Sequence, residues 1–229
     1  MKTLGLIGGT SWVSTIDYYR LINQMVNERM GGISAATLLL YSVNFAEFLP
    51  PSDEAGWRHF TSRFIAIARK LESGGAEGLV LCANTPHKVA PEISAAVTIP
   101  LIHIAEVTAR EVDRHKHSII GLLGTRFTMQ ERFYHETLAN YGIRTLIPEA
   151  ADREYIHETI LGDFAKNTFT PEHKARYLRI IDDLEKAGAQ AIILGCTEIP
   201  ILIKPHDCRL PLFDTTVLHA RAAADFALG

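Results

Sequence analysis

Ala191-Ile192-Ile193-Leu194-Gly195-Cys196-Thr197-Glu198-Ile199-Pro200 is the stretch that decides how this chain folds. Its apolar and partly β-branched run is typical of a buried strand, and the strand ends at a glycine turn that carries a thiol. An earlier stretch has the same form: Gly78-Leu79-Val80-Leu81-Cys82-Ala83-Asn84-Thr85. The two stretches predict two buried strands that end in equivalent turns.

Three pairs of segments recur along the chain in the same order. Residues 5–10 resemble 121–125 at an offset of 116 residues, 71–76 resemble 184–189 at an offset of 113, and 99–102 resemble 210–213 at an offset of 111. Three matches with nearly constant spacing indicate an internal repeat. The chain is therefore expected to consist of a duplicated unit.

The repeat also predicts which residues are equivalent. The offset of 113 places Cys196 opposite Ala83, and it places Cys82 opposite Gly195. Adjacent side chains on a strand point to opposite faces. Cys82 is therefore expected to point away from the side that Cys196 occupies, unless the turn breaks the alternation.

Composition excludes several classes of protein. The chain has 229 residues, of which 47% are apolar and 21% are charged, with a formal net charge of −3. No basic stripe favours nucleic acid, and no apolar run reaches the roughly 20 residues of a membrane span. The N-terminus has no signal-peptide layout. Three cysteines, an odd number, favour reduced thiols and a cytoplasmic location.

Strand-like and helix-like segments alternate along the chain. Strands are predicted at 4–7, 36–43, 78–81, 101–104, 118–123, 191–194 and 210–213, and helices at 15–30, 57–72, 128–141 and 171–186. This alternation predicts parallel sheets covered by helices. The expected fold is α/β, with two similar Rossmann-like three-layer α/β domains related by a pseudo-twofold axis. The first domain is expected to contain residues 1–99 and 209–229, and the second 100–208.

Ligands of such sheets bind at the carboxyl ends of the strands. We expect the turns there to converge on the cleft between the two domains, where hydroxyl, amide and backbone donors favour an anion such as a carboxylate. The candidate substrate-binding residues are Gly9, Thr10, Ala83, Asn84, Thr85, Thr125, Thr197 and Glu198.

Several of these motifs have more than one interpretation. The spacing in 5–10 is not that of a dinucleotide-binding or phosphate-binding loop, and no spacing predicts a metal site. Cys196 is the first candidate for a catalytic thiol, with a pKa lowered by a helix N-terminus, although most free cysteines are simply buried. Cys82 is a second catalytic candidate, although the pattern favours packing for it. His87 is suited to an anion or to a structural hydrogen bond.

A known family shares these motifs. Gly-Gly-Thr-Ser-Trp at 8–12, Asn84-Thr85 with His87, Gly-Leu-Leu-Gly-Thr-Arg at 121–126 and Gly-Cys-Thr-Glu-Ile-Pro at 195–200 resemble the aspartate/glutamate racemase family. The pattern is most similar to the broad-specificity amino-acid racemase subgroup. The resemblance implies two pseudosymmetric α/β domains, a site in the cleft, an amino-acid substrate, no cofactor and a homodimer.

The resemblance also implies a chemistry. Racemisation needs an acid/base on each side of the Cα atom. In two-thiol members of the family, a cysteine directly precedes Asn-Thr, and this chain has Ala83 there. Cys196 is then one acid/base, and Cys82, water or His87 would have to supply the other. Family patterns with an arginine near 46–48 differ from this chain, which has Ala-Glu-Phe there.

The sequence thus predicts a cofactor-independent amino-acid racemase of the aspartate/glutamate type, an isomerase that uses a cysteine thiol at the Cα proton. Two alternatives remain open. One is a one-thiol decarboxylase or another enzyme of the same fold that protonates one face only. The other is a catalytically silent protein that binds carboxylates.

Overall fold

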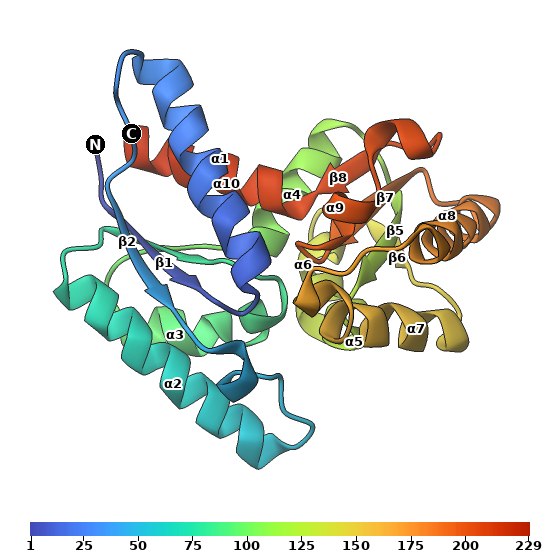
Figure 1. Ribbon diagram of the computed structural model, residues 1–229, viewed down its shortest axis with the longest axis horizontal. Coiled ribbons are helices and arrows are strands. Elements are labelled where there is room, and N and C mark those ends of the chain that lie inside the picture. The colour runs from blue at the N-terminus through green and yellow to red at the C-terminus, as the bar shows by residue number, and fades with distance from the viewer. The chain divides into compact units, whose positions relative to one another are not determined.

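Two compact units make up the chain, and the computed structural model describes all residues from Met1 to Gly229. Unit 1 contains residues 1–104 and 219–229, and unit 2 contains residues 105–218. Each unit has one parallel four-stranded sheet with helices packed around it (Figure 1). The strand order is β2-β1-β3-β4 in unit 1 and β6-β5-β7-β8 in unit 2. The identical strand order agrees with the internal repeat.

Unit 1 is built from the two ends of the chain. Its strands are β1 (Leu4–Gly8), β2 (Leu38–Ser42), β3 (Gly78–Leu81) and β4 (Leu101–Ile102). Its helices are α1 (Trp12–Met30), α2 (Glu54–Ser73), α3 (Ala90–Ala96) and most of α10 (Thr215–Leu228), with short 3₁₀ turns η1 (Phe45–Glu47) and η2 (Thr85–Val89).

Unit 2 is built from the middle of the chain. Its strands are β5 (Ile119–Gly124), β6 (Arg144–Leu146), β7 (Ala191–Gly195) and β8 (Leu212–Asp214). Its helices are α4 (Ile104–Arg114), α5 (Arg126–Gln130), α6 (Arg132–Ala139), α7 (Ala150–Leu161), α8 (Pro171–Lys186) and α9 (Ile199–Leu202), with 3₁₀ turns η3 (Phe164–Lys166) and η4 (Pro205–Asp207).

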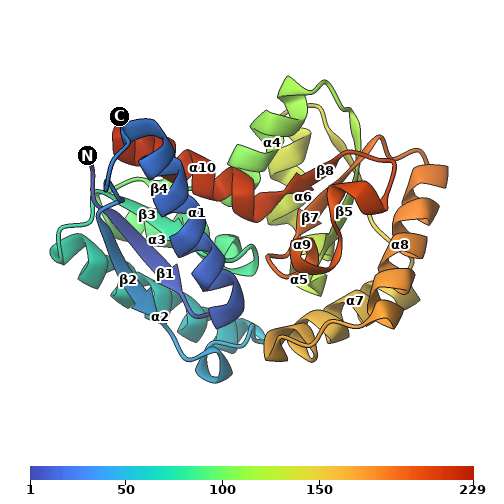
Figure 2. The ribbon, with the colours of Figure 1, turned by 45° about the horizontal axis from the view of Figure 1, so that its top comes forward.

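Both sheets are covered on their two faces, so each unit has three layers. In unit 1, α1 and α10 bury one face in a core that includes Tyr18 and Ala223, and α2 and α3 bury the other in a core that includes Phe64 and Ile93. In unit 2, α4 and α6 cover one face and α7 and α8 the other, as Figure 2 shows. Strands buried on both faces explain the continuous apolar runs in the sequence.

The domain boundaries differ from those predicted. The strand at 210–213 was expected to complete the first domain, but β8 pairs with β7 in unit 2. The strand after residue 100 was assigned to the second domain, but β4 pairs with β3 in unit 1. Strand β4 thus extends the sheet of β3, and β8 extends the sheet of β7. Only the chain from His219 onward returns to unit 1.

Some elements gave no clear signal in the sequence. Strand β6 and the helices α3, α4, α7, α9 and α10 were not predicted. The helix predicted at 128–141 is split into α5 and α6, because Glu131 between them has an extended backbone, with φ −87° and ψ 154°. The side chains of β6 are exposed or half-buried, which explains why this edge strand lacks an apolar run.

Strand register confirms the predicted equivalence of the two turns. Ile7 pairs with Leu81 in sheet 1, so the next residues, Gly8 and Cys82, are level. Gly124 pairs with Gly195 in the other sheet. Gly8 and Gly124 correspond in the repeat, and the residues that follow the level pairs are Ala83 and Cys196. The two units therefore carry an alanine and a cysteine at the same position of the same turn.

The return of α10 to unit 1 can be tested at Gly78. A Cβ atom at this position would lie 2.4 Å from a ring carbon of Phe226 in α10. We therefore expect Gly78→Ala to lower the free energy of unfolding by about 1–3 kcal/mol, as overpacking does. The measurement is urea unfolding of the single variant.

The control is the double variant Gly78→Ala/Phe226→Leu. Because the shorter side chain removes the clash, Gly78→Ala should cost much less in the Phe226→Leu background than in the wild type. Additive losses would contradict the packing of α10 on sheet 1.

Candidate acid–base site

The thiol turn of unit 2 joins a cysteine to a buried carboxylate. Cys196 follows β7 and is 7% exposed, and its Sγ donates a hydrogen bond to Glu198 Oε2 over 3.0 Å. The Thr197 hydroxyl donates to the same oxygen over 2.9 Å. Glu198 is only 3% exposed, and its Oε1 atom is buried without a hydrogen-bond partner in the protein. A buried carboxylate oxygen with spare acceptor capacity is available to take a proton or to bind a donor of a ligand.

The electrostatics of Cys196 differ from the prediction. Burial raises the pKa of its thiol well above the ordinary value, and the charge and hydrogen bond of Glu198 raise the pKa further. The backbone amides of Thr197 and Glu198 act in the opposite direction but are outweighed. The following helix, α9, has only four residues and begins next to the Glu198 carboxylate. The resting state of Cys196 is therefore the protonated thiol.

Glu198 also has a different role from the one expected of a residue at a helix start. It occupies the N-cap position of α9, but its side chain makes no capping hydrogen bond. The carboxylate instead accepts hydrogen bonds from the Cys196 thiol and the Thr197 hydroxyl. The structure thus joins Cys196, Thr197 and Glu198 in a single hydrogen-bonded group.

Tyr177 belongs to the same core as Cys196. It was not identified as a site residue from the sequence. Its hydroxyl is 2.9 Å from Thr159 Oγ1, and burial raises its pKa well above the ordinary value, with Cys196 and Glu198 adding to the effect. The only signal in the sequence was an apolar position on α8, which indicates the core. Tyr177 therefore adds a neutral hydroxyl near the thiol and carboxylate.

The equivalent turn of unit 1 has no ionisable side chain at the position of the thiol. Ala83 is half-buried, whereas Asn84 and Thr85 are 3% and 7% exposed. His87 Nδ1 lies 2.9 Å from the Ala83 carbonyl oxygen, and the His87 ring is fully buried. His87 is thus used to hold the backbone of this turn.

Cys82, which follows β3 directly, packs into the core of unit 1. It is 1% exposed and belongs to the core that α1 and α10 form on β1 and β3. Burial raises the pKa of its thiol. These surroundings are those of a packed apolar cysteine.

The turn between β1 and α1 collects polar groups at the start of a 19-residue helix. Gly9 has φ +84°, and a Cβ atom there would lie 2.2 Å from the Val43 carbonyl oxygen, so only glycine fits. The hydroxyls of Thr10 and Ser11 are buried without a hydrogen-bond partner in the protein. Donors at the positive end of a helix dipole suit a carboxylate. The Thr15 hydroxyl accepts a hydrogen bond from the Gly9 amide. Neither Ser11 nor Thr15 was among the predicted site residues.

In the turn after β5, the Thr125 hydroxyl caps the helix that follows. Thr125 is the N-cap of α5, and its Oγ1 accepts from the Thr128 amide over 3.4 Å. Thr216, at the start of α10, was not predicted, but its Oγ1 is buried without a partner in the protein, and it follows β8, the neighbour of β7. The sequence gave no signal for Thr216 beyond its position after a strand.

The predicted site residues thus fall into two groups, one in each unit. Gly9, Thr10, Ala83, Asn84 and Thr85 lie at the carboxyl ends of the adjacent strands β1 and β3. The second group is Thr125, Cys196, Thr197 and Glu198, at the carboxyl ends of the adjacent strands β5 and β7.

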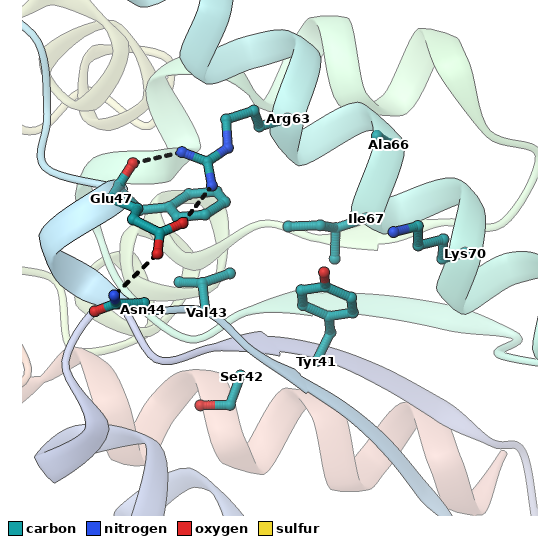
Figure 3. A pocket seen from close by; sticks show the side chains of 10 residues that line it. Tyr41, Ser42, Val43, Asn44, Glu47, Arg63, Ala66, Ile67 and Lys70 are labelled. Atoms are coloured by element: carbon teal, nitrogen blue, oxygen red, sulfur yellow. Dashed lines mark hydrogen bonds and ion pairs between the residues drawn. The ribbon is translucent and has the colours of Figure 1, made fainter.

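A separate pocket of about 260 Å³ lies between the end of β2, η1 and α2 in unit 1 (Figure 3). Arg63 donates there to the Glu47 carbonyl oxygen over 2.6 Å and to Glu47 Oε2 over 3.2 Å, and Asn44 donates to Glu47 Oε1 over 3.0 Å. The Arg63 guanidinium also lies 3.7 Å from the centre of the Phe48 ring. The pocket therefore has its arginine already neutralised by Glu47, and none of the predicted site residues lines it.

Two kinds of feature are absent from the structure. No group of three or more histidine, cysteine, aspartate or glutamate side chains is arranged so that it could hold a metal ion. None of the helices combines the length and the apolar character that spanning a membrane requires.

Comparison with known proteins identifies the family. The model of the Asp/Glu/hydantoin racemase family matches residues 7–223. The crystal structure of a protein from Yersinia pestis, provisionally named an Asp/Glu racemase, is similar to all of this chain over its own full length, with 44% identity and a TM-score of 0.91. PH1733, an aspartate racemase homologue from Pyrococcus horikoshii OT3, is similar over the full length of both chains, with 32% identity and a TM-score of 0.85.

A curated relative has a name that specifies an activity. RacX, a broad-specificity amino-acid racemase from Bacillus subtilis strain 168, is 25% identical over 155 residues, which are 68% of this chain and 66% of RacX. The match of the family model and the two full-length structural similarities agree with the resemblance seen in the motifs. The chain therefore belongs to the Asp/Glu/hydantoin racemase family.

Proposed function

We propose that the protein is a cofactor-independent amino-acid racemase in which Cys196 moves the Cα proton of the substrate. The family supports an isomerase that acts on amino acids. The observation that carries the proposal is the 3.0 Å hydrogen bond from Cys196 Sγ to Glu198 Oε2. A thiol paired with a buried carboxylate has both a proton to give and a nearby acceptor for it.

The pair can generate a thiolate without creating net charge. Cys196 rests as a thiol, and only the thiolate can abstract a proton from Cα. Transfer of the thiol proton to Glu198 gives a thiolate and a carboxylic acid, so the buried site keeps a single negative charge. The thiolate then takes the Cα proton, and the thiol that results returns a proton to the carbanion in the reverse step.

The polar turns of unit 1 are proposed to bind the substrate carboxylate. Thr10 and Ser11 bring buried hydroxyls to the N-terminus of α1, and Asn84 and Thr85 bring side chains at the end of the neighbouring strand. Thr10 and Ser11, at the positive end of the α1 dipole, are proposed to stabilise also the negative charge that spreads onto the carboxylate when the Cα proton leaves. We propose that these groups bind the carboxylate of the same substrate whose Cα proton Cys196 moves.

A second candidate function is protonation of one face only, as in a one-thiol decarboxylase. It is favoured by Ala83, whose methyl group carries no exchangeable proton, and by the burial of Cys82 in the core. Such an enzyme would release CO₂ from a substituted malonate and give one enantiomer of the product. For the racemase, water is the proposed proton carrier on the face of Ala83.

Aspartate and glutamate are the first substrates to test, because they give the family its name. The homodimer and the cytoplasmic location implied by the sequence remain proposals. Sedimentation velocity on the purified protein decides the oligomeric state.

Replacement of Cys196 tests the proposed acid/base. We expect Cys196→Ala to lower the rate of racemisation by at least about 10²–10⁴-fold, because the proton carrier is lost. Chiral chromatography of each amino acid after incubation with enzyme gives the rate. Cys208→Ser is the control, since Cys208 lies in no predicted site and should tolerate the change. A Cys196→Ala enzyme as active as this control would exclude the mechanism.

The influence of Glu198 on the thiol can be measured without a substrate. Its charge and its hydrogen bond raise the pKa of Cys196, so Glu198→Gln should lower this pKa and increase the thiolate fraction at a given pH. The rate of iodoacetamide alkylation at Cys196, followed by mass spectrometry of its peptide, should therefore rise at lower pH than in the wild type.

Racemisation should nevertheless fall in Glu198→Gln, because the amide cannot accept the thiol proton as a carboxylate does. Alkylation that shifts to higher pH in the variant would contradict the assigned interaction.

The equivalence of Ala83 and Cys196 predicts a gain of function. Ala83→Cys places a thiol at the position equivalent to Cys196, and we expect faster racemisation by about 10-fold or more if the second acid/base limits the rate. Cys82→Ala is the matched variant one residue away, and it should leave the catalytic rate within about threefold of the wild type. The opposite pattern, with loss at Cys82→Ala and no gain at Ala83→Cys, would assign the second thiol to Cys82.

A further inference from the structure

A network of buried histidines in unit 1 is not used by the proposed chemistry. His87 in η2 and His219 in α10 are both fully buried, and their ring centres lie 5.4 Å apart in an edge-to-face arrangement. Tyr18 in α1 is also fully buried, and its hydroxyl lies 2.8 Å from His219 Nδ1. We refer to Tyr18, His219 and His87 as the histidine network.

Backbone carbonyls fix where the protons of this network lie. A carbonyl oxygen only accepts hydrogen bonds. Because His87 Nδ1 lies 2.9 Å from the Ala83 carbonyl oxygen, Nδ1 carries the proton of that ring. Because His219 Nε2 lies 2.7 Å from the Ile102 carbonyl oxygen, Nε2 carries the proton of the second ring. His219 Nδ1 is then an acceptor, and the Tyr18 hydroxyl donates to it.

The surroundings keep both rings neutral. Burial lowers the pKa of His219 to about 4, and burial together with the neighbouring His103 and His219 lowers the pKa of His87 well below its ordinary value. The two rings therefore keep the same tautomers at neutral pH.

The network connects separate parts of unit 1 to the turn that the proposed function uses. It links α1, the end of β4 at Ile102, and α10 to η2, and it ends at the carbonyl oxygen of Ala83. That carbonyl directly precedes Asn84, and the Asn84 carbonyl in turn accepts from the backbone amide of His87. The ring and the backbone amide of His87 thus contact two consecutive carbonyl groups, those of Ala83 and Asn84, directly before η2.

We propose that the histidine network positions the turn of Ala83, Asn84 and Thr85 so that the turn binds the carboxylate of the substrate. The inference rests on the proposed function, which assigns the turn to that carboxylate. His87 acts through the backbone of the turn, and His219 and Tyr18 act through the placement of His87. All three are positioning residues.

Variants of His87 separate positioning from simple packing. His87→Leu removes the hydrogen bond to Ala83, whereas His87→Asn retains a donor, the side-chain NH₂, close to the place of Nδ1. Tyr18→Phe removes only the hydroxyl that His219 accepts. Ile22→Val is the control, because Ile22 is fully buried in the same core as Tyr18 and takes no part in the network.

The kinetic result expected is a selective loss of substrate binding. A turn that binds the carboxylate in both the ground state and the transition state affects KM more than kcat. We expect His87→Leu to raise KM about 10-fold or more with kcat within about threefold, and His87→Asn to recover most of the loss. A His87→Leu enzyme whose KM matches that of Ile22→Val would overturn the proposal.

Nuclear magnetic resonance tests the network without any activity. ¹⁵N spectra of the histidine rings should show protonated Nδ1 in His87 and protonated Nε2 in His219. Tyr18→Phe and His87→Leu should shift the backbone amide signal of Asn84 more than Ile22→Val does. Reversed tautomers, or an Asn84 signal that moves no more than in the control, would overturn the proposal. If the wild type racemises no amino acid, the proposed function fails, and these spectra alone decide whether the network positions the turn.

Discussion

The arrangement depends on two central strands that are buried on both faces. β3 lies between β1 and β4, and β7 lies between β5 and β8, so neither strand can shift without moving a whole apolar core. The residue that follows each strand is therefore fixed by the register of the sheet. This constraint places Ala83 and Cys196 at equivalent positions in two units of the same topology. A difference of one side chain at that position separates a turn with a thiol from a turn without one.

A second constraint is the cost of burying charge beside the thiol. Glu198 is almost fully buried, and a carboxylate in such a place is stabilised only when donors satisfy it. The Cys196 thiol and the Thr197 hydroxyl provide two donors, so the carboxylate and the protonated thiol stabilise one another. The same contact that holds the thiol neutral at rest also supplies the acceptor that the proposed reaction needs. Structure and chemistry are coupled through this single hydrogen bond.

Much of this could be predicted from particular residues. The apolar runs that became β3 and β7, the repeat offset and the glycine turns were enough to predict the α/β class, the duplication and the equivalence of Ala83 with Cys196. The edge strand β6 was missed because its side chains are exposed or half-buried and form no apolar run. The domain boundaries were wrong because sequence similarity shows that β4 and β8 correspond to each other, not which sheet each one joins.

Site electrostatics were harder to predict than the fold. A cysteine at a strand end suggested a lowered pKa, but the direction is set by burial and by the Glu198 carboxylate, whose orientation no spacing reveals. His219 contacts Tyr18 and His87, which lie far from it in the sequence, so these contacts could not be read from local motifs. The bond of Tyr177 to Thr159 joins the helices α8 and α7 and depends on how they pack. Hydroxyls such as Ser11 and Thr216 were likewise visible only once their burial was known.

The most direct test of the central claim, that Cys196 is an acid/base for one face of the substrate, is proton exchange at Cα. Each enantiomer of aspartate and glutamate is incubated with the enzyme in D₂O, and loss of the Cα–H signal is compared with inversion measured by a chiral assay. Because enantiomers have equal free energy, kcat/KM for inversion must be the same in both directions. For the enantiomer whose Cα–H faces Cys196, the account predicts that deuterium exchange is faster than inversion, because the thiol can return a deuteron to the face from which it took the proton. For the other enantiomer, it predicts that deuterium enters only as the molecule inverts. Exchange in strict proportion to inversion from both enantiomers, or no exchange from either, would contradict the claim.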